Sequence, residues 1–282
     1  MFFNHIDIHN FRGIESLTIK NIKQVNLITG RNNCGKTSVL EAIFLLTGMS
    51  NPQLILSIHS FRNISLTDND DFSYIFNNFD LSQYPSITGQ LDSHKRNLKI
   101  KAVDSITLKP LNHNSEQLQL PKEKFISNLS TDKQDTVEGL TFYFNIDGKD
   151  FQSGVKLNLG QSNLGQLNLG QLNLGQLNSV EIKLAQNYKE NLIGNFINPQ
   201  TIMNNLDRRL DAMLVRKDLG TIVNAIKKIE PNLIDIRMGA RGMIYADIGI
   251  DKLVPINILG DGIRRILAIL AAISERKNSI LL

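Results

Sequence analysis

The first fifty residues alternate in polarity and then change to a helical period. Residues 3–10 and 15–22 place apolar side chains at every second position, which is typical of half-buried strands. The run Val-Asn-Leu-Ile-Thr at 25–29 is short, apolar and followed by a glycine, so it predicts a third, buried strand. In residues 37–46 the apolar positions recur at helical spacing. We therefore expect three strands followed by a helix.

Alternating segments dominate the middle of the chain. Residues 54–64 fit a second helix, and the Asp-Gly pair at 147–148, directly after an apolar run, predicts a hairpin turn. The predicted strands of this region are residues 97–103, 105–108, 140–146 and 180–184. These strands predict an antiparallel, β-rich insert over residues 61–199.

A five-residue repeat occupies residues 157–178, where the unit Leu-Asn-Leu-Gly-Gln recurs in tandem. It resembles the pentapeptide-repeat pattern of square β-solenoids, but leucine stands where that pattern has a small residue. Four copies make one coil, whereas a solenoid needs roughly three or more stacked units to bury a core. A glycine in every unit also favours a strand or loop over a helix. We favour a tandem expansion that lengthens a surface hairpin.

The last third of the chain is mainly helical, because its apolar residues recur with the period of a helix. The predicted helices are residues 202–215, 221–229 and 262–274. The predicted short strands are residues 235–237 and 243–250, and residues 279–282 begin another apolar strand. A turn with two glycines, Gly239 and Gly242, joins the first two of these strands.

The composition mainly argues against disulfide-linked, secreted and membrane-spanning classes of protein. Hydrophobic residues make up 41% of the 282 residues, which is ordinary for a globular protein with a sizeable core. Cys34 is the one cysteine, so no intrachain disulfide forms, which fits a reducing cytoplasm. The first residues do not have the form of a signal peptide, and no apolar run approaches the roughly 18 residues of a spanning helix. We expect a cytoplasmic protein with no membrane partner.

The positive charge is concentrated near the C-terminal end. The formal net charge is +4, and residues 201–282 alone contain 13 Lys/Arg against 9 Asp/Glu. Such a segment either contacts the phosphate backbone of a nucleic acid or forms a solvated helix face. We favour the solvated face and keep DNA as the alternative.

The strongest motif lies between the third predicted strand and the first predicted helix. The glycines of a phosphate loop let successive N–H groups converge on phosphate oxygens, and the helix N-terminus adds partial positive charge. Lys36 would contact the β- and γ-phosphates, Thr37 would ligate Mg²⁺ and Ser38 would donate to the α-phosphate. The loop therefore predicts binding of ATP with Mg²⁺, and a strand-to-helix turn that binds nothing is the alternative. The residues that fit the pattern GxxxxGK(S/T) are Gly30, Arg31, Asn32, Asn33, Cys34, Gly35, Lys36 and Thr37.

The segment before the loop resembles one branch of the phosphate-loop ATPases. Asn10-Phe11-Arg12-Gly13, followed by a strand and a loop with two asparagines, resembles AAA-family ATPases of the ABC, SMC and RecF-like head type, closest to OLD-like ATPases. The resemblance implies an α/β fold, a P-loop NTPase of the ABC-type head, with a central sheet flanked by helices and an antiparallel β subdomain. It implies a single head over residues 1–282, with a nucleotide-binding core of 1–60 and 200–282. It also implies that Arg12 lies close to the nucleotide.

A second resemblance lies at the start of the last predicted helix. Gly260-Asp261-Gly262, followed by Ile-Arg-Arg-Ile-Leu, resembles the GDG signature of the OLD-like ATPases. In such families the signature of one subunit caps the γ-phosphate that the other subunit's loop binds. The resemblance therefore implies a head-to-head dimer on ATP binding, with this segment acting in trans. An ordinary helix cap is the alternative, because Asp is a good N-cap residue.

The resembled family also has a Walker B strand that ends in an Asp-Glu pair. There the Asp holds Mg²⁺ through water and the Glu activates the attacking water. Residues 278–282 look like the start of that strand, and no Asp-Glu pair follows an apolar strand elsewhere. We therefore expect a central sheet that is incomplete at its C-terminal end and hydrolysis that is impaired or absent. The sequence assigns no catalytic residue.

Three functions fit these observations. The first is an ATPase head that dimerises on ATP binding, with a nuclease or DNA as a partner by resemblance to OLD-like relatives. The second is a non-hydrolysing ATP-dependent switch, or a partner-binding fragment of a longer or split ATPase. The third is a remnant without independent function. We favour the ATP-binding head.

Overall fold

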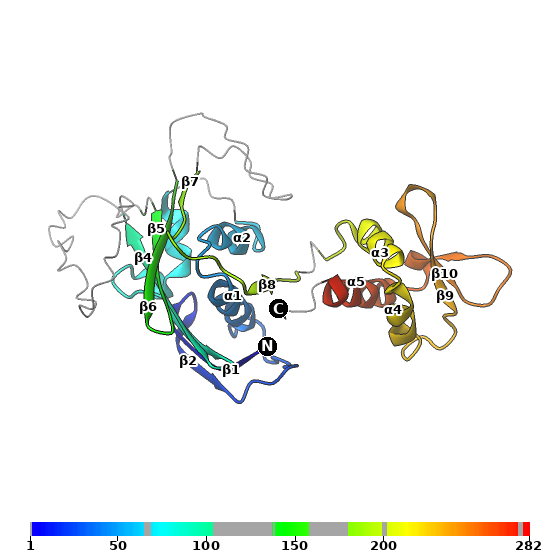
Figure 1. The fold of residues 1–282 in the computed structure, drawn as a ribbon, viewed down its shortest axis with the longest axis horizontal. Coiled ribbons are helices and arrows are strands. Elements are labelled where there is room, and N and C mark those ends of the chain that lie inside the picture. Colours follow the sequence, from blue (N-terminus) through cyan, green and yellow to red (C-terminus); the bar gives the residue numbers. More distant parts are fainter. Residues whose placement is uncertain are drawn as a thin grey trace. The chain divides into compact units, whose positions relative to one another are not determined.

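A seven-stranded antiparallel sheet dominates the computed structural model, which describes residues 2–64, 69–103, 137, 139–157, 180–198, 202–275 and 279–282. The chain divides into two compact units, Met1–Ile193 and Gly194–Leu282, called unit 1 and unit 2 below. Each unit is built around its own hydrophobic core, and Figure 1 shows the helices and strands of both. The predicted strand 105–108 and nearly all of the repeat at 157–178 lie outside the described residues. The single head with a shared core stays a prediction.

The sheet of unit 1 has the order β2-β1-β3-β4-β5-β6-β7. The alternating N-terminal segments form its first hairpin, in which Ile6 pairs with Ile19 and Ile8 with Leu17. The turn at Asp147-Gly148 joins β5 to β6, which confirms the predicted hairpin. The strands are β1 (Phe3–Phe11), β2 (Ile14–Lys20), β3 (Ser86–Leu91), β4 (His94–Val103), β5 (Gly139–Ile146), β6 (Lys149–Leu157) and β7 (Val180–Lys183).

The helices of unit 1 are α1 (Lys36–Thr47) and α2 (Leu54–Ser60), and both lie on the same side of the sheet (Figure 1). Helix α1 packs across β1, β3 and β4, so the apolar spacing of residues 37–46 is confirmed as a buried helix face. Two 3-10 helices, η1 (Asn69–Ile75) and η2 (Asn77–Phe79), follow. The fully buried large side chains of this core include Ile6, Ile8, Phe11, Leu45, Leu46, Ile55, Phe72, Phe76 and Phe142.

Residues 25–29 do not form the predicted buried strand. They lie outside every strand, and Val25 and Leu27 are 86% and 89% exposed. A buried strand needs hydrogen-bonded neighbours and covered faces, and among the described residues no strand pairs with this segment. The prediction was wrong here because apolar composition alone does not supply those neighbours. The large sheet that the structure shows is antiparallel and is made of other strands.

Unit 2 combines three helices with a small sheet of order β11-β10-β9. The three predicted helices are confirmed, with ends that shift by a few residues. Helix α5 packs against both α3 and α4, and their inward faces form the core of the unit. The elements are α3 (Leu206–Val215), α4 (Leu219–Ile226), β9 (Asp235–Met238), η3 (Ala240–Gly242), β10 (Ile244–Asp247), β11 (Val254–Pro255), η4 (Ile256–Ile258) and α5 (Asp261–Glu275). A separate two-stranded ladder pairs β12 (Ser279–Leu281) with β8 (Ile193–Asn195).

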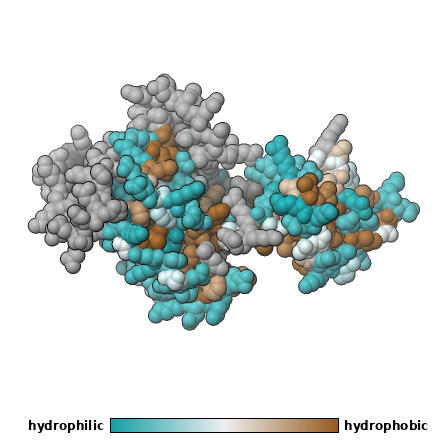
Figure 2. Space-filling model, viewed as in Figure 1, coloured by the Kyte–Doolittle hydropathy of each residue, from teal (hydrophilic) through white to brown (hydrophobic). Residues whose placement is uncertain are grey.

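Hydrophobic side chains also remain on the surface of unit 2. Figure 2 shows hydrophobic residues interspersed with hydrophilic ones on one face of the molecule. Among the helices of the described chain, none is both long enough and apolar enough to cross a membrane. The exposed large hydrophobic residues of this unit are Leu214, Val215, Ile229, Ile234, Met243, Ile250, Leu253, Ile258, Ile269 and Ile273.

Candidate phosphate-binding site

Residues 30–34 and 37 of the loop are exposed, Gly35 and Lys36 are half-buried, and the loop leads directly into α1. Gly35 is the N-cap of α1 with φ 85°, a left-handed conformation that favours glycine. Gly30 has φ 155°, and a Cβ atom there would lie 2.7 Å from Cys34 Sγ. No side chain caps the helix and its first turn carries no acidic residue. The N–H groups of the first turn are therefore available to an anion.

The side chain of Lys36 folds back over the loop. Its Nζ donates to the carbonyl oxygens of Gly30 at 2.9 Å and Arg31 at 2.6 Å, and lies 3.8 Å from Cys34 Sγ. These contacts place the ammonium group within the curve of the loop. A phosphate at the loop would therefore meet backbone donors and a cation together.

The segment Asn10–Gly13 forms the turn that brings Arg12 to α1. The turn joins β1 to β2, and Arg12 has a left-handed φ of 52°. The backbone there is fixed on both sides, because Arg12 N donates to Ile75 O at 2.8 Å and Asn77 Nδ2 donates to Arg12 O at 2.7 Å. The conformation that a side-chain-bearing residue disfavours is thus held by tertiary contacts.

A buried carboxylate, Glu41, lies one turn into α1 and binds two guanidinium groups. Arg12 Nε lies 2.7 Å from Glu41 Oε2, and the side chains of Arg12 and Glu41 are 8% and 0% exposed. Arg62 holds the same carboxylate in a bidentate pair, Nε to Oε1 at 2.6 Å and Nη2 to Oε2 at 3.0 Å. Arg62 Nη2 also donates to Ser38 Oγ at 3.3 Å. We call Arg12, Ser38, Glu41 and Arg62 the subloop cluster.

Arg12 is incompletely satisfied within this cluster. Its Nε contacts Glu41 by distance, but the N–H direction is poor for a hydrogen bond, and its Nη2 is buried with no acceptor among the described residues. Burial lowers the pKa of Arg12 to about 10, and the attraction of Glu41 only partly offsets this. One carboxylate between two guanidiniums leaves a net positive charge, which an anion at the neighbouring loop would help to balance.

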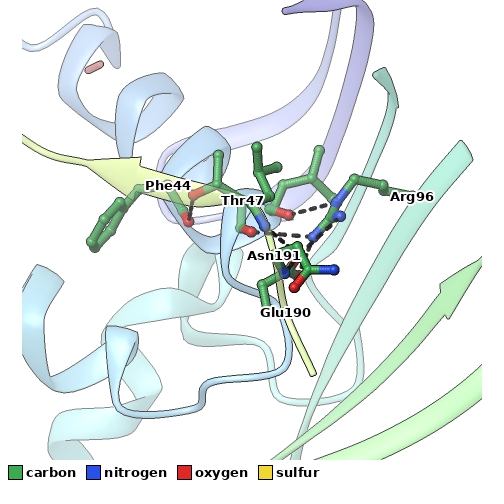
Figure 3. A network of polar contacts seen from close by, with 7 residues as sticks. Phe44, Thr47, Arg96, Glu190 and Asn191 are labelled. Carbon is green, nitrogen blue, oxygen red and sulfur yellow. Dashed lines mark hydrogen bonds and ion pairs between the residues drawn. The ribbon is translucent and has the colours of Figure 1, made fainter. Parts of the chain in front are cut away.

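The other end of α1 is fixed by a second polar network (Figure 3). Arg96, from β4, donates Nε to Leu46 O at 3.2 Å and Nη2 to Thr47 O at 3.1 Å. Its guanidinium also pairs with Glu190. A cation on the last carbonyls of a helix satisfies unpaired acceptors and opposes the negative end of the helix dipole. Arg96 therefore anchors the helix whose first turn carries the loop.

The segment Gly260-Asp261-Gly262 lies at the start of α5 in unit 2, with Gly260 just before the helix, as the sequence predicted for a helix start. Gly260 has φ 108°, all three residues are exposed, and a Cβ at either glycine would meet nothing within 4 Å. Asp261 pairs with Arg265 one turn further on, at 3.2 Å. The segment is thus an open helix start, and a role in trans stays a prediction.

Thr37, the predicted Mg²⁺ ligand, is exposed at the second position of α1. Its hydroxyl lies next to the loop lysine in sequence, which fits a cation bound together with a phosphate rather than by protein side chains alone. In the described part of the chain there is no group of three or more His, Cys, Asp or Glu that would hold a metal ion.

Two residues of the subloop cluster, Glu41 and Arg62, were not predicted from the sequence. Glu41 did leave a signal, because it is the one charged residue in the apolar run of residues 38–46. A charge at a buried position needs a partner, so a cation was to be expected. Arg62 lies 21 residues further along the chain, and nothing local in the sequence connects the two.

Comparisons with known proteins give the family of the chain. A family model described as the AAA ATPase domain matches residues 1–158. The chain is 48% identical over 46 residues to the DNA replication and repair protein RecF of Nitrosococcus oceani, covering 16% of this chain and 13% of the relative. It is 31% identical over 104 residues to an ATP/GTP phosphatase of Helicobacter pylori, covering 36% and 28%.

A third relative is an uncharacterized protein of Methanocaldococcus jannaschii, 52% identical over 40 residues, 14% of this chain and 18% of the relative. The matched stretches therefore span only 13% to 28% of the length of these three relatives. The family model, in contrast, covers residues 1–158 of 282, more than half of the chain. The chain belongs to the AAA ATPase domain family.

Proposed function

We propose that this chain binds ATP with Mg²⁺ at residues 30–37 and acts as an ATPase head of the ABC, SMC and RecF-like type, closest to OLD-like ATPases. The observation that carries the proposal is the exposed loop before α1, with its left-handed Gly35, uncapped helix start and inward Lys36. Such a site binds phosphate through backbone N–H groups, the helix dipole and a point charge.

Each loop residue has a role in this proposal. Lys36 binds the β- and γ-phosphates, Thr37 ligates Mg²⁺ and Ser38 donates to the α-phosphate. Arg12 lies close to the nucleotide, and its buried, unpaired Nη2 is a donor that suits an anion. The remaining residues of the loop supply backbone donors.

A second copy of the chain is the proposed partner. In the proposal, residues 1–282 form a single head, with a core of 1–60 and 200–282 and a β-rich insert of 61–199. ATP binding joins two such heads, and the exposed segment Gly260–Gly262 of one acts on the nucleotide of the other. The open helix start at Asp261 supports this role, because its free N–H groups suit a γ-phosphate. DNA is a further partner, supported by the name of the RecF relatives, and a nuclease is a partner by resemblance to OLD-like ATPases.

In this proposal the head hydrolyses ATP slowly or not at all. The alternative is a non-hydrolysing ATP-dependent switch, or a partner-binding fragment of a longer or split ATPase. Glu41, the buried carboxylate of α1, is engaged by two guanidinium groups, so we do not assign it as a general base. Release of phosphate from ATP, measured at steady state, separates the two forms. Turnover that disappears in Lys36→Ala would establish a hydrolysing head.

Titration of the full chain with labelled ATP in the presence of Mg²⁺ tests the binding site. Lys36→Ala removes a charge-assisted contact worth about 1.5–3 kcal/mol, so we expect affinity to fall at least tenfold. Lys23→Ala, which removes an exposed lysine before the loop, is the matched control and should bind like the wild type. Equal affinity in Lys36→Ala and the wild type would refute the assignment.

A further inference from the structure

Arg62 lies outside the phosphate loop, yet its guanidinium group contacts α1, the helix that follows the loop. It follows α2 and sits in a closed turn, in which Arg62 N and Ile64 N both donate to His59 O at 3.0 Å. The neighbouring Phe61 packs on Phe44 of α1, with ring centroids 6.0 Å apart. The turn therefore holds the Arg62 backbone firmly against α1.

The guanidinium group of Arg62 binds two side chains, Glu41 and Ser38. Its Nε and Nη2 bind both oxygens of Glu41, while Nη2 also donates to Ser38 Oγ at 3.3 Å. A guanidinium has no acceptor, so Ser38 must be the acceptor of that bond. The Ser38 hydroxyl then keeps its proton for another partner.

Ser38 is the first buried residue after the loop, with 6% exposure. A buried hydroxyl without a fixed orientation readily turns to a local backbone carbonyl of its own helix. The Arg62 contact occupies one lone pair and so restricts the directions in which the O–H can point. A phosphate oxygen bound at the first turn of α1 would be an acceptor for that proton.

We propose that Arg62 is a positioning residue of the nucleotide site, which orients the Ser38 hydroxyl so that its proton is donated to a phosphate group at the loop. The pairing with Glu41 makes this possible, because the bidentate contact fixes the plane of the guanidinium. The inference rests on the proposed function, since it needs a nucleotide phosphate at residues 30–37. Arg62 itself need not touch the ligand.

Binding of ATP with Mg²⁺ to the full chain, measured by calorimetry, tests the proposal through a double-mutant cycle. Arg62→Met and Ser38→Ala should each weaken binding about fivefold, the factor for one ordinary hydrogen bond. Because both changes remove the same interaction, the double variant should also lose about fivefold rather than about 25-fold. Inorganic tripolyphosphate should show the same losses, since the contact is to phosphate.

Arg62→Lys separates positioning from structural support. Lysine keeps a positive charge beside Glu41 but lacks the planar fork that serves both partners. We expect the midpoint of thermal unfolding to return most of the way to the wild-type value while ATP affinity stays lowered. A purely structural role would instead change the fraction of binding-competent protein and leave the affinity of that fraction unchanged.

The outcomes are distinguishable. Wild-type affinity in Arg62→Met, or losses that multiply in the double variant, would overturn the role of Arg62 while leaving the ATP site intact. Absence of ATP binding by the wild type would overturn the proposed function and this inference with it. If Arg62→Met does not fold, the cycle is closed with Arg62→Lys and Ser38→Ala, and the same non-additivity is required.

Discussion

Replacement of Glu41 by alanine is expected to destabilise unit 1 by about 3–5 kcal/mol, the usual cost of breaking a buried ion pair. Glu41 is completely buried and is the shared counter-ion of Arg12 and Arg62. Its removal leaves two cations beside each other at the base of the phosphate loop. The loss should therefore exceed that of a surface salt bridge, which is typically about 0–1 kcal/mol.

The two arginines do not contribute equally to this expected loss. The Arg62 side chain is 34% exposed and can turn to water, so its share should resemble that of a surface pair. Arg12 is 8% exposed, and its backbone is fixed by the hairpin turn, so its charge stays buried. Even with Glu41 present, burial lowers the pKa of Arg12 to about 10. Most of the destabilisation should thus come from Arg12.

This division predicts a second-site rescue. Arg12→Met in the Glu41→Ala background removes the stranded charge and should recover about 2 kcal/mol or more, because a buried pair replaced by apolar groups is often nearly neutral. In the wild-type background Arg12→Met leaves Glu41 paired with Arg62. The coupling between positions 12 and 41 should therefore be large.

Hydrogen exchange read by mass spectrometry measures the effect in each unit separately. Peptides from β1 and α1 should lose protection in Glu41→Ala, while peptides from α3 and α5 of unit 2 serve as an internal reference. Glu15→Ala, which removes an exposed glutamate of β2, is the control and should stay within about 0.5 kcal/mol of the wild type. A Glu41→Ala loss below about 1 kcal/mol, or no rescue by Arg12→Met, would refute the argument.

Two further predictions concern the polar contacts of the sheet. Arg96→Met should cost unit 1 about 2–4 kcal/mol, because it uncaps the end of α1 and removes the cation beside Glu190, whose carboxylate keeps its hydrogen bonds from Asn191 N and Leu192 N. Protection of peptides from the end of α1 reports this loss, and unchanged protection would contradict the role of the network. The second prediction concerns Asp147, whose pKa is lowered below its ordinary 3.8 by hydrogen bonds from His94 and then from Lys95 N. The ionised Asp147 therefore stabilises the folded state above pH 3.8, and this stabilisation is lost as pH falls through the pKa of the folded state. The wild type should therefore melt at a higher temperature than Asp147→Asn at about pH 5 and lose that advantage towards about pH 2; a difference that does not change with pH would count against this assignment.

The elements that local pattern alone determines were predicted well. Helices α1 and α5 and strands β1, β4 and β5 carry a clear period and lie where expected. Strands β3 and β6 were missed, because both mix polar residues and a glycine into their alternation. The buried strand predicted at residues 25–29 was wrong for the opposite reason. Its composition suits a buried strand, but burial depends on neighbouring strands, which a local pattern does not reveal.

The residues of the candidate site were likewise predictable only where a local sequence pattern marks them. The loop residues and Arg12 could be proposed from the sequence, because a fixed spacing marks the loop and a resemblance to a family segment marks Arg12. The pairing of Glu41 with Arg62 was not, because it joins α1 to the turn after α2, and the two residues are 21 positions apart in the chain. What the sequence lacks is the information on which side chains meet once α1 and α2 pack together. Only the packed structure shows that Arg62 also reaches Ser38.

The hydrogen bonds from Lys36 to its own loop have a kinetic consequence. The ammonium group occupies the curve of the loop by binding the carbonyls of Gly30 and Arg31, so a phosphate must displace it from acceptors that already satisfy it. If that opening costs about 1.4 kcal/mol, the receptive population is about one tenth and the apparent affinity falls by the same factor. A lysine side chain changes rotamer in picoseconds to nanoseconds, far faster than mixing, so the observed rate should rise linearly with nucleotide concentration, with a slope lowered to about one tenth. A rate that levels off in stopped-flow mixing with ATP would contradict this, because it requires a step slower than this opening.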